Sequence, residues 1–160
     1  LESIFNFLIH SNKISFKLEG ANILDLYSGT GSFGLECLSR GANKIIFIEK
    51  EKEAVKILVQ NIRKIKKIKN TKIFINDTLS LLKKNTFNLK FDLIFCDPPF
   101  KDKNTEELIE LVFQKRLLEK KGILILHRNK NVIDKIPNNF HIIDERIYGI
   151  SKVIFVTLLS

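Results

Sequence analysis

The sequence predicts an α/β protein with a Rossmann-like, doubly wound sheet of about seven strands, mostly parallel, with an antiparallel C-terminal hairpin. Short apolar runs alternate with amphipathic helical segments, which is the alternation that builds a parallel sheet covered on both faces. Near the C-terminus, two extended runs are separated only by Gly149-Ile150-Ser151, a connection of hairpin length.

The strands are predicted from short apolar runs and the helices from apolar stripes with a period of 3.6 residues. One such stripe consists of Ala54, Val55, Leu58, Val59 and Ile62. Gly41 ends the helix before it, and Asp77 or Thr78 caps a later one. The expected strands are residues 21–26, 44–49, 72–76, 91–96, 122–127, 141–148 and 152–159. The expected helices are residues 1–9 (with Ile4, Phe5, Leu8 and Ile9 inward), 33–40, 52–64, 78–84 and 105–118 (with Leu118 inward).

The length and composition are those of one domain, which we assign to residues 1–160. A chain of 160 residues with 44% hydrophobic residues can bury a substantial core without disulfides or metals. Its two cysteines, Cys37 and Cys96, are expected to be buried and reduced, as in a cytoplasmic protein. No apolar stretch reaches the roughly 18 residues of a membrane span, and no signal peptide is recognised. Because the chain begins at Leu1, we expect an N-terminal segment of the native protein to be missing.

The formal charge of +9 favours a polyanionic partner such as nucleic acid. Only five of the 27 basic residues are arginine, and lysine, isoleucine, asparagine and phenylalanine are abundant. An AT-rich genome produces the same bias, so the charge supports a nucleic-acid partner without proving one.

Four acidic residues are predicted to meet at one edge of the sheet. Asp25, Glu49, Asp77 and Asp97 each lie at or just after the carboxyl end of a different strand. In open α/β sheets, ligands bind at this edge, close to the point where the strand order reverses. The four side chains therefore indicate a ligand site.

The segment Gly29-Thr30-Gly31-Ser32-Phe33-Gly34 fits the G-x-G-x-x-G pattern between a strand and a helix. Its glycines allow a tight turn and a close approach of the backbone to a ligand. A dinucleotide would place its pyrophosphate on the helix N-terminus. S-adenosylmethionine carries a sulfonium and an ammonium and would need a carboxylate, which Asp25 supplies. The loop alone does not choose between these two cofactors.

The other two carboxylates of the predicted cofactor site have competing interpretations. Glu49 can hold ribose hydroxyls, and Asp77 can accept from an adenine amino group. A capping or turn role is the alternative for Asp25, for Glu49 and, with equal weight, for Asp77.

Asp97-Pro98-Pro99-Phe100 directly follows the strand at 91–96. Two prolines remove two backbone donors and stiffen the loop, so it presents only acceptors, the Asp97 carboxylate and the Pro98 carbonyl. A planar amino group has two hydrogens and needs two acceptors, and Phe100 offers a ring on which a base can stack. This predicts a clamp for an amino group that receives a methyl group by direct displacement. A simple tight turn is the alternative.

The motifs DLYSGTGSFGLE and DPPF resemble those of the S-adenosylmethionine-dependent amino methyltransferases. More specifically, the chain is similar to the bacterial methyltransferases that modify guanine N2 in 16S ribosomal RNA. Further matches are Glu2-Ser3-Ile4-Phe5-Asn6, residues 35–42 and Glu145-Arg146-Ile147-Tyr148-Gly149. The basic, arginine-containing N-terminal segment usual in that family is absent here.

This resemblance implies S-adenosylmethionine as cofactor, and ribosomal RNA or a small-subunit assembly particle as partner of a cytoplasmic monomer. The implied catalytic residues are Asp97, Pro98, Pro99 and Phe100. The implied cofactor-binding residues are Asp25, Ser28, Gly29, Thr30, Gly31, Glu49 and Asp77.

Other functions are left open by the residues themselves. The amino group could belong to adenine N6, cytosine N4 or a protein glutamine, and a dinucleotide-dependent oxidoreductase or a non-catalytic RNA-binding assembly factor would share the fold. Lys101 and Lys103, next to the clamp, are candidates for phosphate contacts. His10, His127 and His141 show no ligand spacing, and we predict neither a metal nor a membrane partner.

Overall fold

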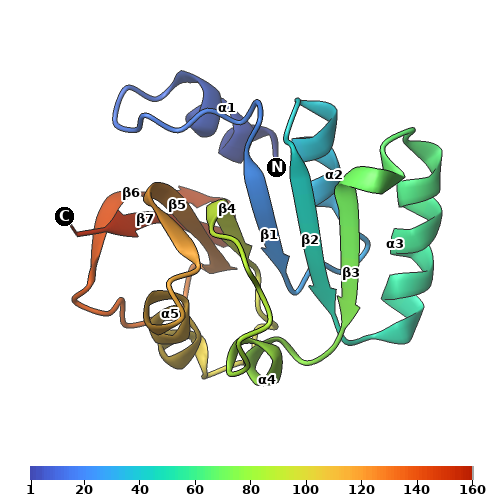
Figure 1. Ribbon diagram of the computed structural model, residues 1–160. Helices are drawn as coiled ribbons and strands as arrows, with labels where there is room; N and C mark the ends of the chain where they lie inside the picture. The colour runs from blue at the N-terminus through green and yellow to red at the C-terminus, as the bar shows by residue number, and fades with distance from the viewer. Residues whose placement is uncertain (160) are drawn as a thin grey trace.

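The computed structural model describes residues 1–159, which form a seven-stranded sheet in the order β3-β2-β1-β4-β5-β7-β6 (Figure 1). Strands β1 to β5 run parallel, and β7 is antiparallel to both of its neighbours, β5 and β6. The strands are β1 Asn22–Leu26, β2 Lys44–Glu49, β3 Thr71–Ile75, β4 Phe91–Cys96, β5 Leu118–Asn129, β6 Phe140–Tyr148 and β7 Ser151–Leu158.

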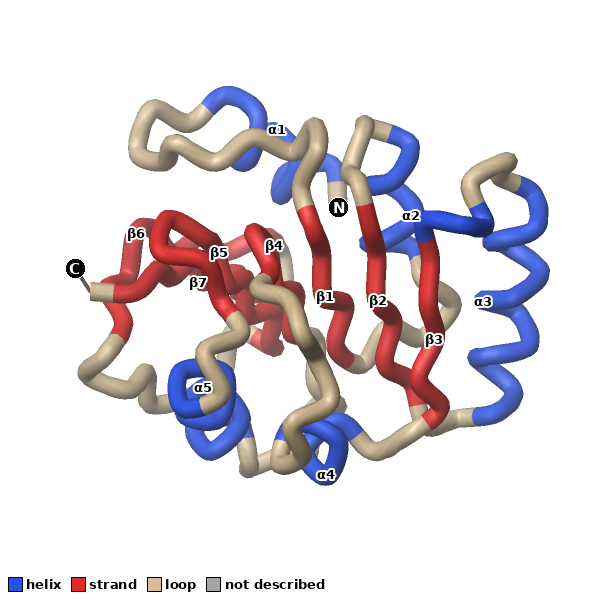
Figure 2. The backbone as a smooth tube through the Cα atoms, in the orientation of Figure 1, coloured by secondary structure: helices blue, strands red, loops and turns tan. Residues whose placement is uncertain are grey.

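The helices cover both faces of this sheet (Figure 2). They are α1 Glu2–His10, α2 Ser32–Ser39, α3 Lys52–Lys64, α4 Thr78–Leu82 and α5 Thr105–Gln114, with a short 3₁₀ turn at Ile68–Asn70. The predicted α/β fold, with its doubly wound, mostly parallel sheet and C-terminal antiparallel hairpin, is confirmed.

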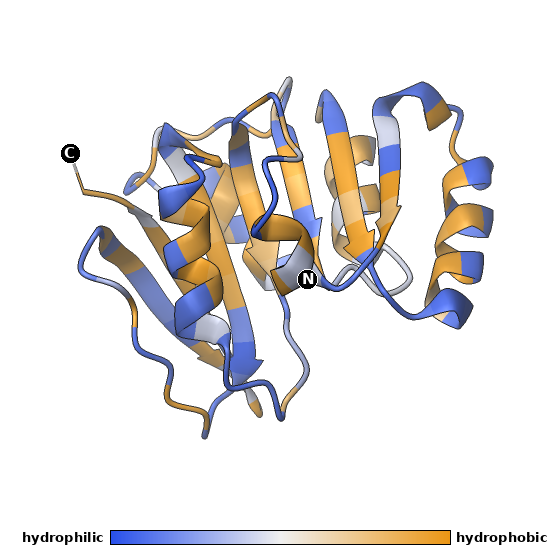
Figure 3. Cartoon of the chain, turned by 60° about the horizontal axis from the view of Figure 1, so that its bottom comes forward, coloured by the Kyte–Doolittle hydropathy of each residue, from blue (hydrophilic) through white to orange (hydrophobic). Residues whose placement is uncertain are grey.

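Two hydrophobic cores lie on opposite faces of the sheet because successive strand residues point to opposite sides. Ile23 packs with α1, α2 and α3 on one face, and Leu24 packs with α4 and α5 on the other. Strands buried on both faces are continuously apolar, as expected for a parallel sheet. Figure 3 shows this pattern as strands coloured mostly hydrophobic and helices that are hydrophilic on their outer sides.

Gly34 sets the close approach of α2 to the sheet. A Cβ atom at this position would lie 2.5 Å from the Phe47 ring and 2.8 Å from Ile45, closer than packed carbon atoms tolerate. Glycine therefore lets the first turn of α2 rest on β2, which fixes the loop between β1 and α2.

Two details of the predicted elements are wrong. The helix expected at 105–118 ends at Gln114, and Leu118 instead begins β5. The chain turns at Arg116, whose φ of 53° is in the left-handed region. In α1, Ile9 is 48% exposed, and Phe7 is the residue that packs in the core.

Among residues 1–159, no helix combines the length and the apolar character needed to cross a lipid bilayer.

Candidate active site

The glycine loop, residues 27–31, follows β1 and turns sharply into α2. Tyr27, Gly29 and Gly31 all have positive φ angles, of 57°, 56° and 88°. A Cβ atom on Gly31 would overlap the Leu58 side chain, so this position needs glycine for space as well as for φ. Ser28 bonds the Ile48 carbonyl through both its amide, at 3.0 Å, and its hydroxyl, at 3.1 Å. The loop is therefore fixed to the carboxyl end of β2.

Glu49, the last residue of β2, joins the glycine loop to the segment before α3. Its Oε1 accepts from the Gly29 N–H at 2.7 Å, and its Oε2 accepts from the Glu51 N–H at 2.9 Å. Each carboxylate oxygen has a second lone-pair direction, so Glu49 can still accept from a ligand hydroxyl. The capping-type role and the ligand role predicted for Glu49 are thus compatible.

Asp25 lies beneath the glycine loop and is 1% exposed. Its Oδ2 accepts from the Gly34 N–H at 3.2 Å, at the start of α2. Burial is the main reason that the pKa of Asp25 rises to about 8; the Gly34 hydrogen bond opposes this shift, and the charges of Asp97 and Glu49 add to it. A buried carboxyl of this kind gains strongly from a bound cation.

Asp77 caps a helix, which is one of the two roles that the sequence predicted for it with equal weight. Its Oδ2 accepts from the Ser80 amide at 3.0 Å and from the Ser80 hydroxyl at 2.9 Å, at the N-terminus of α4. These bonds, the backbone bond above all, lower the pKa of Asp77. Its other oxygen, Oδ1, accepts no hydrogen bond from the described residues, so a ligand role for Asp77 stays a prediction.

The Asp-Pro-Pro-Phe loop, residues 97–100, leaves the carboxyl end of β4, beside the glycine loop. Asp97 Oδ1 lies 3.0 Å from His127 Nδ1, at the end of β5. Within residues 1–159, neither Asp97 Oδ2 nor the Pro98 carbonyl oxygen takes a hydrogen bond. The two acceptors predicted for an amino group are thus both available.

Arg128, the residue after His127 in β5, anchors the same loop through hydrogen bonds. Arg128 is 4% exposed, and its guanidinium donates to the Pro99 carbonyl at 3.0 Å and to the Asp102 carbonyl at 2.9 Å. Its Nε donates to Asp134 at 2.8 Å, which neutralises the buried charge. The Tyr27 hydroxyl donates to the Asp102 carboxylate at 3.3 Å, so the glycine loop also contacts this segment.

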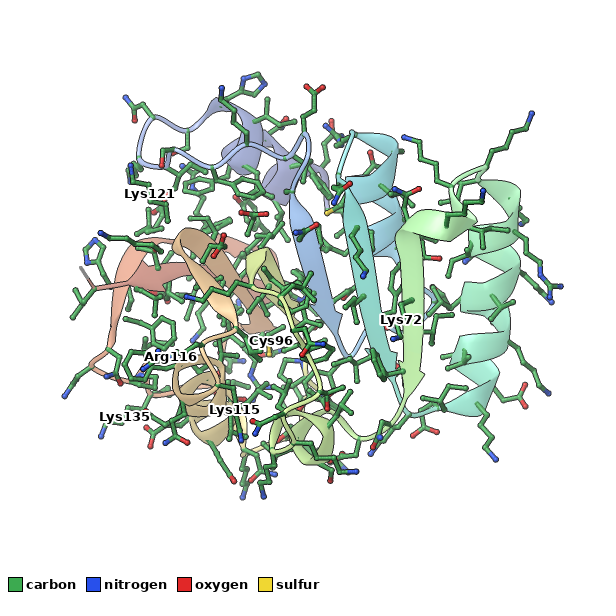
Figure 4. The ribbon with its side chains drawn as sticks, in the orientation of Figure 1. Lys72, Cys96, Lys115, Arg116, Lys121 and Lys135 are labelled. Carbon is green, nitrogen blue, oxygen red and sulfur yellow. The ribbon has the colours of Figure 1, made fainter. Side chains whose placement is uncertain are left out.

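Sequence reasoning missed His127 and Arg128, although a signal for His127 was present. The register pairs Cys96 with Leu126, so the first polar residue after each apolar run, Asp97 and His127, must lie side by side. Figure 4 shows Cys96 in the centre of the molecule, at the end of β4. The role of Arg128 depends on the path of the loop after β4 and has no comparable signal.

Two cavities flank Asp97 and Tyr27 at this edge of the sheet. One, of about 400 Å³, is lined by Asp25, the glycine loop and His127 among others. The other, of about 210 Å³, is lined by Glu49 and by Asn76 and Thr78, the two neighbours of Asp77. The structure therefore brings Asp25, Ser28, Gly29, Glu49 and Asp97 together around adjoining spaces. Phe100 lies on a separate cavity, and Asp77 lines neither of these two.

The sheet order, the glycine loop and the adjoining Asp-Pro-Pro-Phe loop define the chain as a methyltransferase of the α/β class. The model of the family described as "Conserved hypothetical protein 95" matches residues 1–157. The chain belongs to this family of ribosomal RNA methyltransferases.

Individual relatives agree with this assignment. The chain is 34% identical over 142 residues to Ribosomal RNA small subunit methyltransferase D of Buchnera aphidicola subsp. Baizongia pistaciae, covering 87% of this chain and 68% of that protein. It is 28% identical over 150 residues to the protein of the same name from Haemophilus influenzae, covering 93% and 75%. A solved structure of a conserved hypothetical protein from Streptococcus pyogenes has a TM-score of 0.80 and 30% identity, with 87% of each chain covered.

Proposed function

We propose that this protein, acting as a single methyltransferase domain over residues 1–160, transfers a methyl group from S-adenosylmethionine to the N2 amino group of a guanine in small-subunit ribosomal RNA. The observation that carries the proposal is the pair of free acceptors, Asp97 Oδ2 and the Pro98 carbonyl, beside the cavities around the glycine loop. Two acceptors fixed on one rigid loop match the two hydrogens of a planar amino group.

The charges around the glycine loop fit S-adenosylmethionine better than a dinucleotide. Asp25 and Asp97 line one cavity, and Glu49 and Asp97 line the other. The carboxylates of Glu49 and Asp97 disfavour a pyrophosphate, whereas Glu49, together with Asp25 once a cation ionises it, favours a ligand that carries a sulfonium and an ammonium. In this proposal Asp25 and the backbone of Ser28, Gly29, Thr30 and Gly31 hold the methionine part. Glu49 holds the ribose, and Asp77 is the proposed partner of the adenine amino group.

S-adenosylmethionine, when bound, supplies a methyl group activated by the sulfonium. The protein contributes positioning and electrostatics. Asp97 Oδ2 and the Pro98 carbonyl orient the amino group. His127 holds the Asp97 carboxylate in place through a hydrogen bond with Asp97 Oδ1. As the new N–C bond formed, the bond between the methyl carbon and the sulfur would break, with its electron pair left on the sulfur, and the nitrogen would lose a proton. Asp97, which lies against His127, is the proposed acceptor of that proton. Phe100 is the proposed stacking surface for a base.

The RNA substrate is inferred from relatives that carry the name Ribosomal RNA small subunit methyltransferase D, among them the two described above. The charge of +9 agrees with a polyanionic substrate. The choice of guanine N2 rests on the resemblance of the motifs DLYSGTGSFGLE and DPPF, together with the flanking segments, to that family.

The test combines calorimetry with S-adenosylmethionine and transfer of a tritiated methyl group to unmodified small-subunit RNA and particles, followed by nucleoside analysis. We expect cofactor binding and N2-methylguanosine as the product. Asp97→Ala is expected to abolish transfer and to leave the cofactor dissociation constant nearly unchanged. Equal loss of both would contradict the assigned roles, and methylated adenine, cytosine or glutamine would replace the proposed substrate. RNA binding that ignores the cofactor, without transfer, would indicate an assembly factor.

A further inference from the structure

A third cavity, of about 630 Å³, lies beside the Asp-Pro-Pro-Phe loop and shares no lining residue with the two cavities around the glycine loop. One wall is Phe100, the last residue of that loop, with the three residues that follow it up to Lys103. The other wall is the start of the β5–β6 loop, from Val132 to Asp134, and Arg128 also lines the cavity. Of the residues with a role in the proposed reaction, only Phe100 lines this space.

The β5–β6 loop is held in place by two buried cations. Arg128 is 4% exposed and pairs with Asp134, and Lys152 is 8% exposed and donates to the Val132 carbonyl. Burying a cation is costly unless it is paired, so both side chains fix this loop firmly. Ile133, between the two anchored residues, is nevertheless 94% exposed. The loop thus presents an isoleucine side chain to solvent at the rim of the cavity.

The opposite wall has the chemistry of a nucleotide site. Phe100 is 64% exposed, and Lys101 and Lys103 form no ion pair within residues 1–159. The two carboxylates that line the cavity are both engaged: Asp134 pairs with Arg128, and Asp102 accepts from the Tyr27 hydroxyl and from the Asn104 N–H. Neutral donors leave the charge of Asp102 in place, so once Arg128 and Asp134 cancel, the two lysines exceed Asp102 by one positive charge. This net positive charge lies next to the exposed side chains of Phe100 and Ile133.

We propose that this cavity binds the nucleotide next to the methylated one in the RNA chain, with its base against Ile133 and its phosphate at Lys101 and Lys103. This inference rests on the proposed function. Phe100 is three residues from Asp97, at most about 10 Å along the chain, so a nucleotide in this cavity lies close to the one held at Asp97. In this arrangement Phe100 lies between the methylated nucleotide and its neighbour.

The test compares two cavity variants, Ile133→Ser and Lys103→Gln, with two matched controls, Ile68→Ser and Lys121→Gln. Ile68 is also exposed but lies after α3, and Lys121 lies at the amino end of β5, near the α1–β1 connection (Figure 4). All four variants change exposed side chains, so none is expected to unfold the protein. The measurements are equilibrium binding of protein-free small-subunit RNA as a function of salt, and KM and kcat for methyl transfer.

We expect Ile133→Ser to weaken RNA binding by roughly fivefold, the effect of losing part of the apolar contact that an isoleucine side chain makes when it is buried. Lys103→Gln should reduce the slope of log K against log salt by about 0.7, the loss of one phosphate contact on single-stranded RNA. Both should raise KM for RNA and leave S-adenosylmethionine binding unchanged. The control variants should match the wild type in affinity and in salt slope.

Cavity variants that bind RNA like their controls would overturn the inference. Effects seen only with assembled particles, and not with protein-free RNA, would also overturn it, because they would indicate a protein contact. Failure of the proposed function would look different: the wild-type protein itself would bind no S-adenosylmethionine or would transfer no methyl group to RNA.

Discussion

We predict that Asp25 couples cofactor binding to the release of a proton. Burial, with the charges of Asp97 and Glu49, raises its pKa to about 8 against the opposing effect of the Gly34 hydrogen bond. At pH 6.5 the carboxyl is therefore neutral in the free protein. A bound sulfonium or ammonium stabilises the carboxylate, so binding should release close to one proton at this pH. For the same reason, the dissociation constant should fall about tenfold between pH 6 and pH 7.

Isothermal titration of S-adenosylmethionine at pH 6.5, in two buffers with different ionisation enthalpies, measures the released proton directly. The matched control is Asp25→Asn, whose amide oxygen still accepts from the Gly34 N–H but carries no ionisable proton. This variant should bind more weakly, release no proton from this position and show no pH dependence between pH 6 and pH 7. The reasoning is refuted if the wild type gives equal enthalpies in both buffers, or if Asp25→Asn releases as many protons as the wild type.

Three further predictions follow from the contacts of the Asp-Pro-Pro-Phe loop and of α2. Arg128→Lys keeps the charge but loses the planar donor fork to Pro99 and Asp102, so kcat should fall roughly tenfold or more with an unchanged cofactor dissociation constant. His127→Phe removes the partner of Asp97 Oδ1, and the transfer rate measured at saturating cofactor should fall about tenfold. Gly34→Ala places a Cβ against Phe47, and urea denaturation should show about 1–3 kcal/mol less stability.

Each of these outcomes can fail in a recognisable way. Wild-type kcat in Arg128→Lys would mean that a single ammonium holds the loop as well as the guanidinium does. If His127→Phe lost cofactor affinity instead of rate, the histidine would act on the cofactor cavity, which it also lines. An unchanged urea midpoint for Gly34→Ala would show that α2 can move away from β2 without cost.

Local sequence patterns were sufficient for most of the fold, because each strand and helix is encoded in a short window. The stripe of Val55, Leu58 and Ile62 predicted α3 with its observed bounds, and the apolar runs ending at Glu49 and Cys96 predicted β2 and β4. Parallel strands then bring their carboxyl ends to one edge, which places Asp25, Glu49 and Asp97 around adjoining cavities. This part of the site follows from the alternation of strands with helices and from the position of each carboxylate at the carboxyl end of its strand.

The end of α5 could not be predicted in the same way. Leu117 and Leu118 continue the apolar pattern of the helix, but they belong to the turn and to β5, where both are buried. The helix ends because Arg116 adopts the left-handed conformation. Few non-glycine residues adopt this conformation, and no local sequence pattern predicts it here. Tertiary packing of β5 against β4 determines this boundary, and helical periodicity does not.

The proline pair also explains why the Asp-Pro-Pro-Phe loop needs support from another strand. Without N–H groups on Pro98 and Pro99, the loop has few donors with which to bond itself, and its carbonyls must find donors elsewhere or stay exposed. Arginine carries five donors and no acceptor, so a buried arginine on the neighbouring strand complements an acceptor-only loop. Arg128 bonds the Pro99 and Asp102 carbonyls and leaves the Pro98 carbonyl free. The rigidity of this loop, which the proposed function requires for orienting an amino group, therefore depends on both the prolines and β5.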